Sequence, residues 1–187
     1  KKLSTLSNGE EIEGPKPHKN LLGKMRRLNK SLSKKEKGSK NRKKSRIKLS
    51  KLHYKISNIR NDALNKLTTK LSLEYDKIVI EDLNISGMIK NRKLSRAIID
   101  QGFYEFRRQL EYKALMYGSK IIVADRFFPS SKTCSSCGKI HNMDLSKRTM
   151  ICDCGLKMDR DLNAAINLKN LGDSSALLAC GQVSSDS

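Results

Sequence analysis

Four cysteines in two close pairs constrain the fold of this chain more than any other feature. The first pair is Cys134 and Cys137, the second is Cys152 and Cys154, 14 residues lie between the pairs, and a glycine follows each. This spacing is typical of a zinc ribbon, in which two tight turns supply four thiolates to one tetrahedral ion. So few apolar residues lie between the cysteines that metal binding would have to supply much of the folding free energy. We therefore expect a structural zinc site with these four ligands.

Two alternatives to a four-thiolate site remain open. The second pair is one residue shorter than the usual C-x-x-C, and His141, which lies between the pairs, could replace a ligand if the shorter turn fails. Disulfide pairing would require an oxidising compartment, and the sequence shows no charged leader followed by an apolar stretch. The fifth cysteine, Cys180, lies outside the pattern and is expected to be an incidental thiol.

Positive charge is concentrated in one block of the chain. The sequence has 39 Lys and Arg against 19 Asp and Glu, a net charge of +20, and residues 15–70 contain 20 of the basic residues but only two acidic ones. Apolar residues within the block recur every three or four positions, from Leu21 to Leu32 and from Leu49 to Ala63, on either side of a break at Gly38. This pattern predicts an antiparallel helical hairpin rather than a disordered basic tail.

The outer faces of this hairpin are almost wholly basic, and such a surface favours an anionic partner because its charges otherwise repel one another. Nucleic acid is a partner of this kind. We expect its phosphates to contact Arg42, Lys43, Lys44 and Arg46. The longest apolar runs are far shorter than the roughly 18 residues of a membrane helix, so no membrane partner is expected. We expect a cytoplasmic protein.

The remaining segments predict an α/β fold. Residues 3–10 alternate toward Asn8-Gly9, which predicts a type I′ turn between two strands, and residues 75–81 read as a buried strand. A loop around Gly87 is followed by a helix that ends at Gly118 and by a strand over residues 120–124. Strand, helix and strand in this order favour a sheet with a parallel crossover. A last helix is expected over about 162–171, followed by a flexible tail over 173–187.

Several carboxylates stand at the ends of these predicted core elements. Glu81 ends the buried strand, and Asp159 and Asp161 open the last helix. A strand-end acid is often merely solvated, and an Asp at a helix start is often an N-cap. In a chain with this much positive charge, however, such carboxylates could hold two divalent ions that cleave a phosphodiester.

Three stretches together resemble one known family. They are residues 78–84, which read IVIEDLN, residues 126–138, which contain the first cysteine pair, and residues 159–168, which read DRDLNAAINL. In this order they are similar to TnpB proteins, the OrfB-type zinc-ribbon proteins of bacterial insertion sequences and relatives of the compact type V CRISPR nucleases. The likeness extends from Thr5 to Leu171.

The resemblance implies an RNA-guided DNA endonuclease with a RuvC-like nuclease of the RNase H fold. Glu81 would be the second catalytic carboxylate and Asp161 the third, with Asp159 a weaker candidate, and two Mg²⁺ ions would bridge the scissile phosphate. Zinc would be structural, the partners would be DNA and a guide RNA, and a transposase encoded by the same element is a further expected partner. The location would be the bacterial cytoplasm or nucleoid. The implied regions are RuvC strands over 1–14, a basic hairpin over 15–74, a RuvC strand-helix-strand over 75–128, a zinc ribbon over 129–157, a RuvC terminal helix over 158–172 and the tail over 173–187.

One part of the family pattern is not matched. In the family, the first catalytic Asp lies on a strand just before the segment that corresponds to Lys1 and Lys2, and neither lysine can replace it. The chain therefore reads as the carboxy-terminal portion of a longer nuclease, and we expect no cleavage by this chain alone. Two other readings remain: a truncated, nuclease-dead zinc-ribbon protein that binds nucleic acid, and a zinc-ribbon component of transcription or translation machinery.

Overall fold

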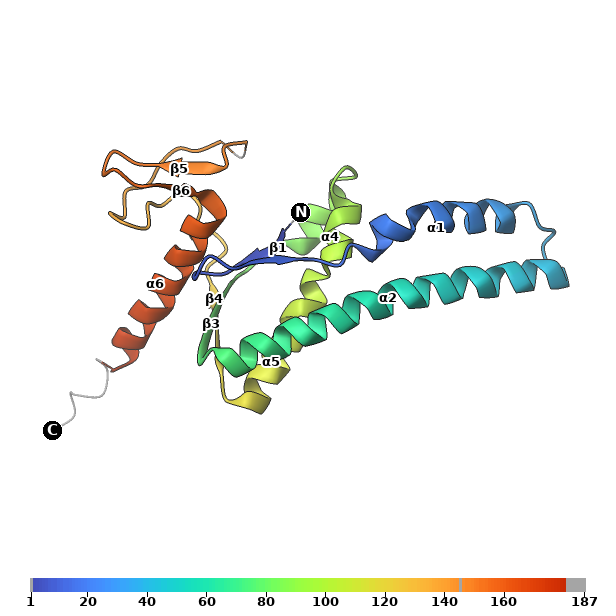
Figure 1. Cartoon of the computed structure of the whole chain (residues 1–187), viewed down its shortest axis with the longest axis horizontal. Coiled ribbons are helices and arrows are strands. Elements are labelled where there is room, and N and C mark those ends of the chain that lie inside the picture. The colour runs from blue at the N-terminus through green and yellow to red at the C-terminus, as the bar shows by residue number, and fades with distance from the viewer. Residues whose placement is uncertain (1, 145, 181–187) are drawn as a thin grey trace. The chain divides into compact units, whose positions relative to one another are not determined.

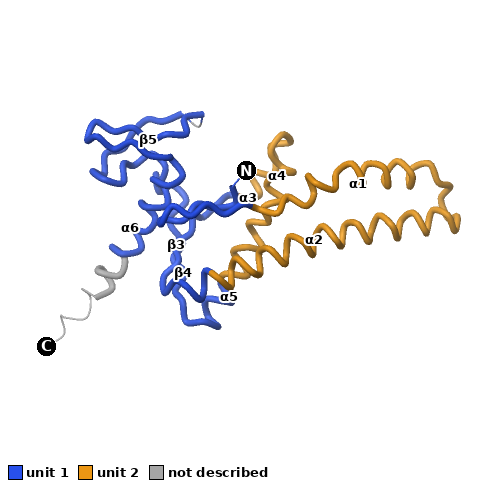
Figure 2. Tube along the Cα trace, in the orientation of Figure 1, with its two compact units in different colours: residues 1–13, 71–84, 111–187 blue, residues 14–70, 85–110 orange. Residues whose placement is uncertain are grey.

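The structure, a computed structural model, describes residues 2–144 and 146–180 (Figure 1). The described residues form two compact units (Figure 2). Unit 1 contains residues 1–13, 71–84 and 111–187, and unit 2 contains residues 14–70 and 85–110. The elements in chain order are β1 (Lys2–Thr5), β2 (Glu11–Glu13), α1 (Pro17–Ser33), α2 (Lys40–Glu74), β3 (Lys77–Glu81), α3 (Ile85–Lys90), α4 (Ser95–Gln101), α5 (Phe103–Tyr117), β4 (Lys120–Ala124), β5 (Thr149–Ile151), β6 (Lys157–Asp159) and α6 (Arg160–Cys180).

Unit 2 contains the predicted helical hairpin. Helices α1 and α2 run antiparallel (Figure 1), and Met25, Leu52 and Ile56 are buried between them. The half-buried side chains of Leu21, Leu28 and Leu49 pack against this cluster. The apolar seam predicted from the period of three and four residues is therefore confirmed.

A pair of short helices, α3 and α4, follows β3 where the sequence predicted a loop around Gly87, so that prediction was wrong. Helix α4 contacts both α3 and α1, and local sequence does not reveal such contacts. Asp100 is 5% exposed and accepts the backbone N–H groups of His18 and Lys19 at 2.9 and 3.0 Å. It thus caps the first turn of α1, a role that serine or aspartate usually performs from within the capped helix itself.

The β1–β2 hairpin of unit 1 is antiparallel, as predicted. Its turn differs from the expected one because the backbone N–H of Gly9 bonds to the carbonyl of Leu6 at 3.0 Å. Ser7 and Asn8 are therefore the central residues, and Gly9 follows them with φ of 90°. A positive φ costs glycine little, so glycine suits this position directly after the turn.

The predicted parallel crossover is confirmed, because β3 pairs with β4 in parallel and in register from Lys77–Lys120 to Glu81–Ala124. Helix α6 packs on β3. A Cβ atom at Gly172 would lie 2.6 Å from Cγ2 of Val79, so the close approach of helix and strand requires glycine there. The fold is α/β, and the described strands pair as three two-stranded sheets.

The end of the chain differs from the prediction. Helix α6 continues to Cys180, so the segment from Asp173 to that residue is helical rather than a flexible tail. The rest of the predicted tail, residues 181–187, lies outside the described residues, as does the side chain of Cys180. Within the described parts of the chain, the structure has no helix with the length and apolar character needed to cross a membrane.

Candidate metal centre and nucleic-acid interface

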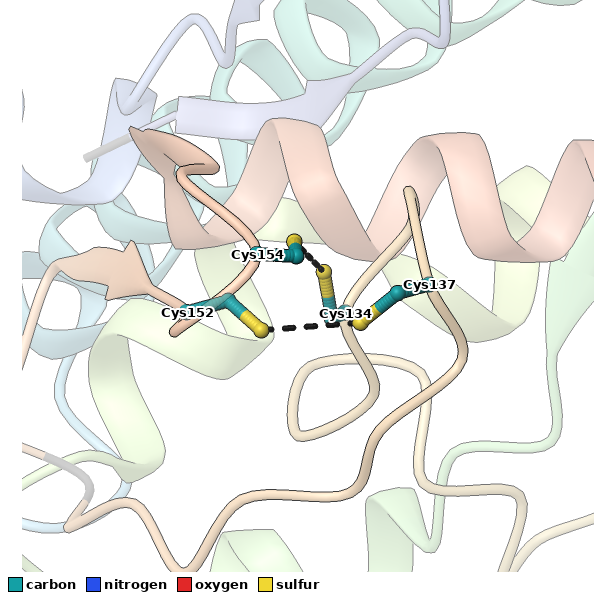
Figure 3. A group of neighbouring side chains, drawn as sticks. All are labelled: Cys134, Cys137, Cys152 and Cys154. Carbon is teal, nitrogen blue, oxygen red and sulfur yellow. Dashed lines mark hydrogen bonds between the residues drawn. The ribbon is translucent and has the colours of Figure 1, made fainter.

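The four predicted zinc ligands converge in unit 1 (Figure 3). Their sulfur atoms all lie within 4.8 Å of one another. The Sγ atoms of Cys134 and Cys154 are 3.6 Å apart, as are those of Cys137 and Cys152. A tetrahedral ion with Zn–S bonds of about 2.3 Å places its ligands about 3.8 Å apart. The cluster therefore has the dimensions of a four-thiolate zinc site, and a disulfide, with sulfurs about 2.05 Å apart, is not formed.

Two tight turns present these sulfurs. In the first, the N–H of Gly138 bonds to the carbonyl of Cys134, and in the second the N–H of Gly155 bonds to the carbonyl of Cys152, at 2.9 and 3.0 Å. Both glycines have positive φ, 75° and 92°. The shorter second pair therefore forms a complete turn, because glycine allows the chain to reverse immediately after it.

Charge within the cluster favours a bound cation. Burial raises the pKa of Cys134, but the backbone N–H groups of Cys137 and Ser136 outweigh this effect and hold it at about 7. The backbone N–H of Cys154 lowers the pKa of Cys152. Burial and the neighbouring sulfurs have the opposite effect and together raise this pKa above its ordinary value, to about 12. Four thiols this close cannot all ionise without a positive ion between them.

His141 lies beside the cluster rather than within it. Its Nε2 atom is 3.2 Å from Sγ of Cys152, a hydrogen-bond distance, while the mutually close group consists of the four cysteines. With four sulfurs in place, the histidine is not needed as a replacement ligand. Its position suits a hydrogen bond to a metal-bound sulfur.

Two buried asparagines of α6 hold the first cysteine turn. Asn163 is fully buried, accepts the N–H of Ser135 at 2.9 Å, and donates to the carbonyl of Thr133 at 2.7 Å. Asn167 donates to the same carbonyl at 2.7 Å and to that of Ser130 at 2.8 Å. Sequence analysis missed this role. The available signal was two amides one helical turn apart, and therefore on one face of the helix.

The three candidate carboxylates lie on three elements of unit 1, namely β3, β6 and α6. Glu81 is the last residue of β3, and its Oε1 accepts the hydroxyl of Ser130 at 2.8 Å. Asp161 lies in the first turn of α6, with one oxygen 3.7 Å from Nη2 of Arg160. Asp159 uses its Oδ1 to accept the N–H groups of Asp161 and Leu162. Among the described residues, these acids do not form a cluster of three that could share an ion, whereas the cysteines do.

A lysine marks the neighbourhood of the two aspartates. Helix α6 contacts β1. The hydrogen bond from Lys2 to Glu11 raises the pKa of the lysine, and the charges of Asp159 and Asp161 add smaller effects in the same direction. The start of β1 therefore lies near the start of α6.

Unit 2 carries the basic surface. It has 26 Lys and Arg against four acidic residues, a net charge of +22, whereas unit 1 has 13 against 15. Three of the four predicted phosphate-binding residues, Lys43, Lys44 and Arg46, are exposed on α2. Arg42 is half-buried instead, and its Nη1 donates to the carbonyls of Leu32 and Lys35 at 3.1 and 2.9 Å. This arginine caps the carboxyl end of α1, so it has a structural role whether or not it also contacts phosphate.

Two family models match the chain. Residues 1–92 match the OrfB_IS605 family, described as "Probable transposase", and residues 103–168 match the Cas12f1-like TNB domain. The second match contains the four clustered cysteines and both candidate aspartates, Asp159 and Asp161. The two matches together span both units.

Curated relatives support the same grouping. A protein of Streptomyces pristinaespiralis named "Putative RNA-guided DNA endonuclease" is 44% identical over 96% of this chain, and InsQ of Escherichia coli K12, of the same description, is 37% identical over 97%. A TnpB-like protein of Acanthamoeba polyphaga mimivirus is 32% identical over 72% of the chain. The chain spans 44% and 49% of the first two relatives, about half of their length.

Solved structures support the fold. A chain in the cryo-EM structure of a Cas12f1–sgRNA–target DNA complex matches 86% of this chain with a TM-score of 0.57 and 22% identity. A CRISPR–Cas12f ternary complex matches 85% with a TM-score of 0.58. This chain covers 43% and 34% of those two proteins.

Proposed function

Because the chain belongs to the TnpB family of transposon-associated proteins, we propose that it supplies the zinc ribbon, the basic hairpin and two catalytic carboxylates of an RNA-guided DNA endonuclease. The observation that carries this proposal is the packing of α6 on β3. This packing puts Glu81, at the carboxyl end of β3, and Asp161, in the first turn of α6, into one compact unit. Carboxylates on adjacent rigid elements are suited to hold Mg²⁺.

The β3–β4 pair and α6 would belong to a RuvC-like sheet of the RNase H type, completed by a strand that carries the first catalytic Asp. In the TnpB family that strand precedes the segment corresponding to β1. Helix α6, whose first turn contains Asp161, contacts β1. A strand that leads into β1 would therefore end close to this carboxylate. Two Mg²⁺ ions bound there would activate water and stabilise the leaving oxygen.

The basic hairpin would contact nucleic-acid phosphates, which supply affinity without sequence selectivity. Base pairing between a guide RNA and the DNA target would then supply selectivity. Zinc in the four-cysteine cluster would be structural, since four protein ligands complete its coordination. A transposase encoded by the same element is a further proposed partner.

Plasmid cleavage with a matched guide in Mg²⁺ buffer tests this proposal. The 187-residue chain would be compared with a chimera that adds the remaining part of the Streptomyces pristinaespiralis relative. We expect cleavage by the chimera and none by the shorter chain, since two carboxylates hold a pair of repelling cations poorly. Tight binding by a chimera that never cuts would instead support the nuclease-dead alternative. Cleavage by the shorter chain alone would contradict the proposed set of three carboxylates.

A further inference from the structure

We propose that Ser130 is a positioning residue for Glu81 and that it links the geometry of this carboxylate to the zinc ribbon. The inference rests on the proposed function in that Glu81 is taken as a metal ligand of the nuclease. It goes further by giving the zinc ribbon a second role, which is to set the orientation of a carboxylate that is not part of the ribbon.

The first link is the hydrogen bond between the two residues. The Ser130 hydroxyl donates to Oε1 of Glu81 at 2.8 Å, and Ser130 is 5% exposed. Glu81 itself is exposed at the end of its strand. An exposed glutamate samples several rotamers, and fixing them costs side-chain entropy. A hydrogen bond from a buried donor to an ionised oxygen favours one of these rotamers before a metal ion arrives.

The second link holds Ser130 in place. Its backbone carbonyl accepts Nδ2 of Asn167 at 2.8 Å, and the same amide nitrogen donates to the carbonyl of Thr133 at 2.7 Å. Asn167 is 6% exposed. A buried amide with both contacts satisfied resists displacement, because losing either one would leave a polar group unpaired.

The third link reaches the cysteines. Asn163 also donates to the carbonyl of Thr133, the residue just before Cys134, and accepts the N–H of Ser135, the residue just after it. The first cysteine turn is thus held on both sides by one side chain. A bound ion that fixes this turn would also fix Thr133, Asn167 and Ser130, and through them the Glu81 carboxylate.

A spectroscopic experiment tests the link without relying on cleavage. The 187-residue chain would be labelled with ¹³C at glutamate carboxyl groups, and the Glu81 resonance assigned by its loss in Glu81→Gln. We expect this resonance to move when zinc is removed and to return when zinc is restored. In Ser130→Ala the resonance should no longer respond to zinc.

Matched variants separate positioning from folding. Ser131→Ala is the control, because the neighbouring hydroxyl makes no hydrogen bond within the described part of the chain, and it should keep the zinc response. Zinc content by elemental analysis reports whether each variant retains the ribbon. If Ser130→Ala loses zinc, Ser130→Thr and Ser130→Val give the same comparison at equal side-chain size, since only threonine keeps the hydroxyl.

A second measurement tests the consequence for catalysis. In the completed chimera, Ser130→Ala should raise the Mg²⁺ concentration for half-maximal cleavage by about fivefold, the effect of losing one hydrogen bond of about 1 kcal/mol. Its maximal rate at saturating Mg²⁺ should change less, and Ser130→Thr should restore the Mg²⁺ dependence. A purely structural role would lower the active fraction without changing the half-saturating concentration.

The outcomes distinguish this inference from the proposed function. Suppose that the chimera cleaves DNA and that this cleavage requires Glu81. If Ser130→Ala and Ser131→Ala then have the same Mg²⁺ dependence of cleavage and the same zinc response of the Glu81 resonance, the positioning role is wrong and the proposed function stands. If the chimera never cleaves, the proposed function fails, and the ¹³C experiment alone decides whether zinc and Glu81 are linked.

Discussion

The carboxylate of Asp159 accepts the backbone N–H of Asp161 at 2.9 Å, so two acids that are two positions apart have different surroundings. Asp159 also accepts the N–H of Leu162 at 3.2 Å and thereby caps the first turn of α6. The Asp161 side chain is 42% exposed and does not take part in the cap. The cap thus gives Asp159 a structural role that Asp161 does not have.

Removing the cap should affect stability, whereas removing the other acid should not. We expect Asp159→Ala to lower the free energy of unfolding by about 1 kcal/mol, the usual cost of losing an N-cap, and Asp159→Asn to recover most of it. Asp161→Ala should cost much less. Thermal unfolding followed by circular dichroism measures the difference. Equal losses for Asp159→Ala and Asp161→Ala would contradict the capping role.

Zinc should bind at about one ion per chain and hold the ribbon together, because the cluster supplies four sulfurs and little apolar core. Elemental analysis of purified protein measures the content. Cys137→Ser should abolish stoichiometric zinc, and His141→Gln should retain it, since the histidine lies outside the sulfur group. A metal-free sample in which residues 129–157 stay protected from hydrogen exchange would refute metal-dependent folding of the ribbon.

Nucleic-acid binding should depend steeply on salt, and the basic residues of α2 should divide into two groups. Each phosphate contact adds about 0.9 to the logarithmic salt slope for duplex DNA. Replacing Lys43, Lys44 and Arg46 together with alanine should therefore lower the slope without changing the melting temperature. Arg42→Ala should lower the melting temperature, because its guanidinium caps α1. An unchanged slope in the triple variant would mean that this face of the hairpin does not contact phosphate.

Acid should weaken unit 2 through Glu105. Hydrogen bonds from Arg108, and then from Gln109, lower the pKa of Glu105 from 4.5 to about 2. Since the folded-state pKa is depressed, this stabilisation is full above pH 4.5 and disappears as the pH falls toward 2. Glu105→Gln should thus have a lower free energy of unfolding than the parent at pH 6, and this difference should be smaller at pH 3.

Urea unfolding at the two pH values measures this difference. Glu36→Gln changes the charge by the same amount in an exposed loop and serves as the control. We expect the difference in unfolding free energy between Glu36→Gln and the parent to be the same at both pH values. A difference for Glu105→Gln that is the same at both pH values would contradict the assigned ion pair.

The features that sequence predicted well are those that local spacing encodes. The cysteine pairs were predictable because each pair and its following glycine encode a tight turn locally, even though asparagines of α6 also hold the first turn. The hairpin seam follows from the helical period, and Met25, Leu52 and Ile56 are buried as that period requires.

The features that sequence missed depend on residues far apart in the chain. Helix α1 is capped by Asp100, which is 82 residues from His18. No sequence pattern near α4 indicates this contact. Arg42 looks like any other basic residue of its run until the turn before α2 brings it to the carbonyls of α1. The link from Ser130 to Glu81 likewise spans 49 residues. Tertiary hydrogen bonds of this kind decide which charged side chains are structural.

Guided plasmid cleavage by carboxylate variants of the completed chimera tests the central claim most directly. The account predicts that Glu81→Ala and Asp161→Ala each abolish Mg²⁺-dependent cutting while leaving nucleic-acid binding intact, since neither residue lies on the basic surface of unit 2. Asp82→Ala is the matched control, because this adjacent acid pairs with Arg126 at 2.6 Å and should leave cutting largely unchanged. Undiminished cutting by Asp161→Ala, or by Glu81→Ala, would contradict the assignment of these carboxylates to the nuclease.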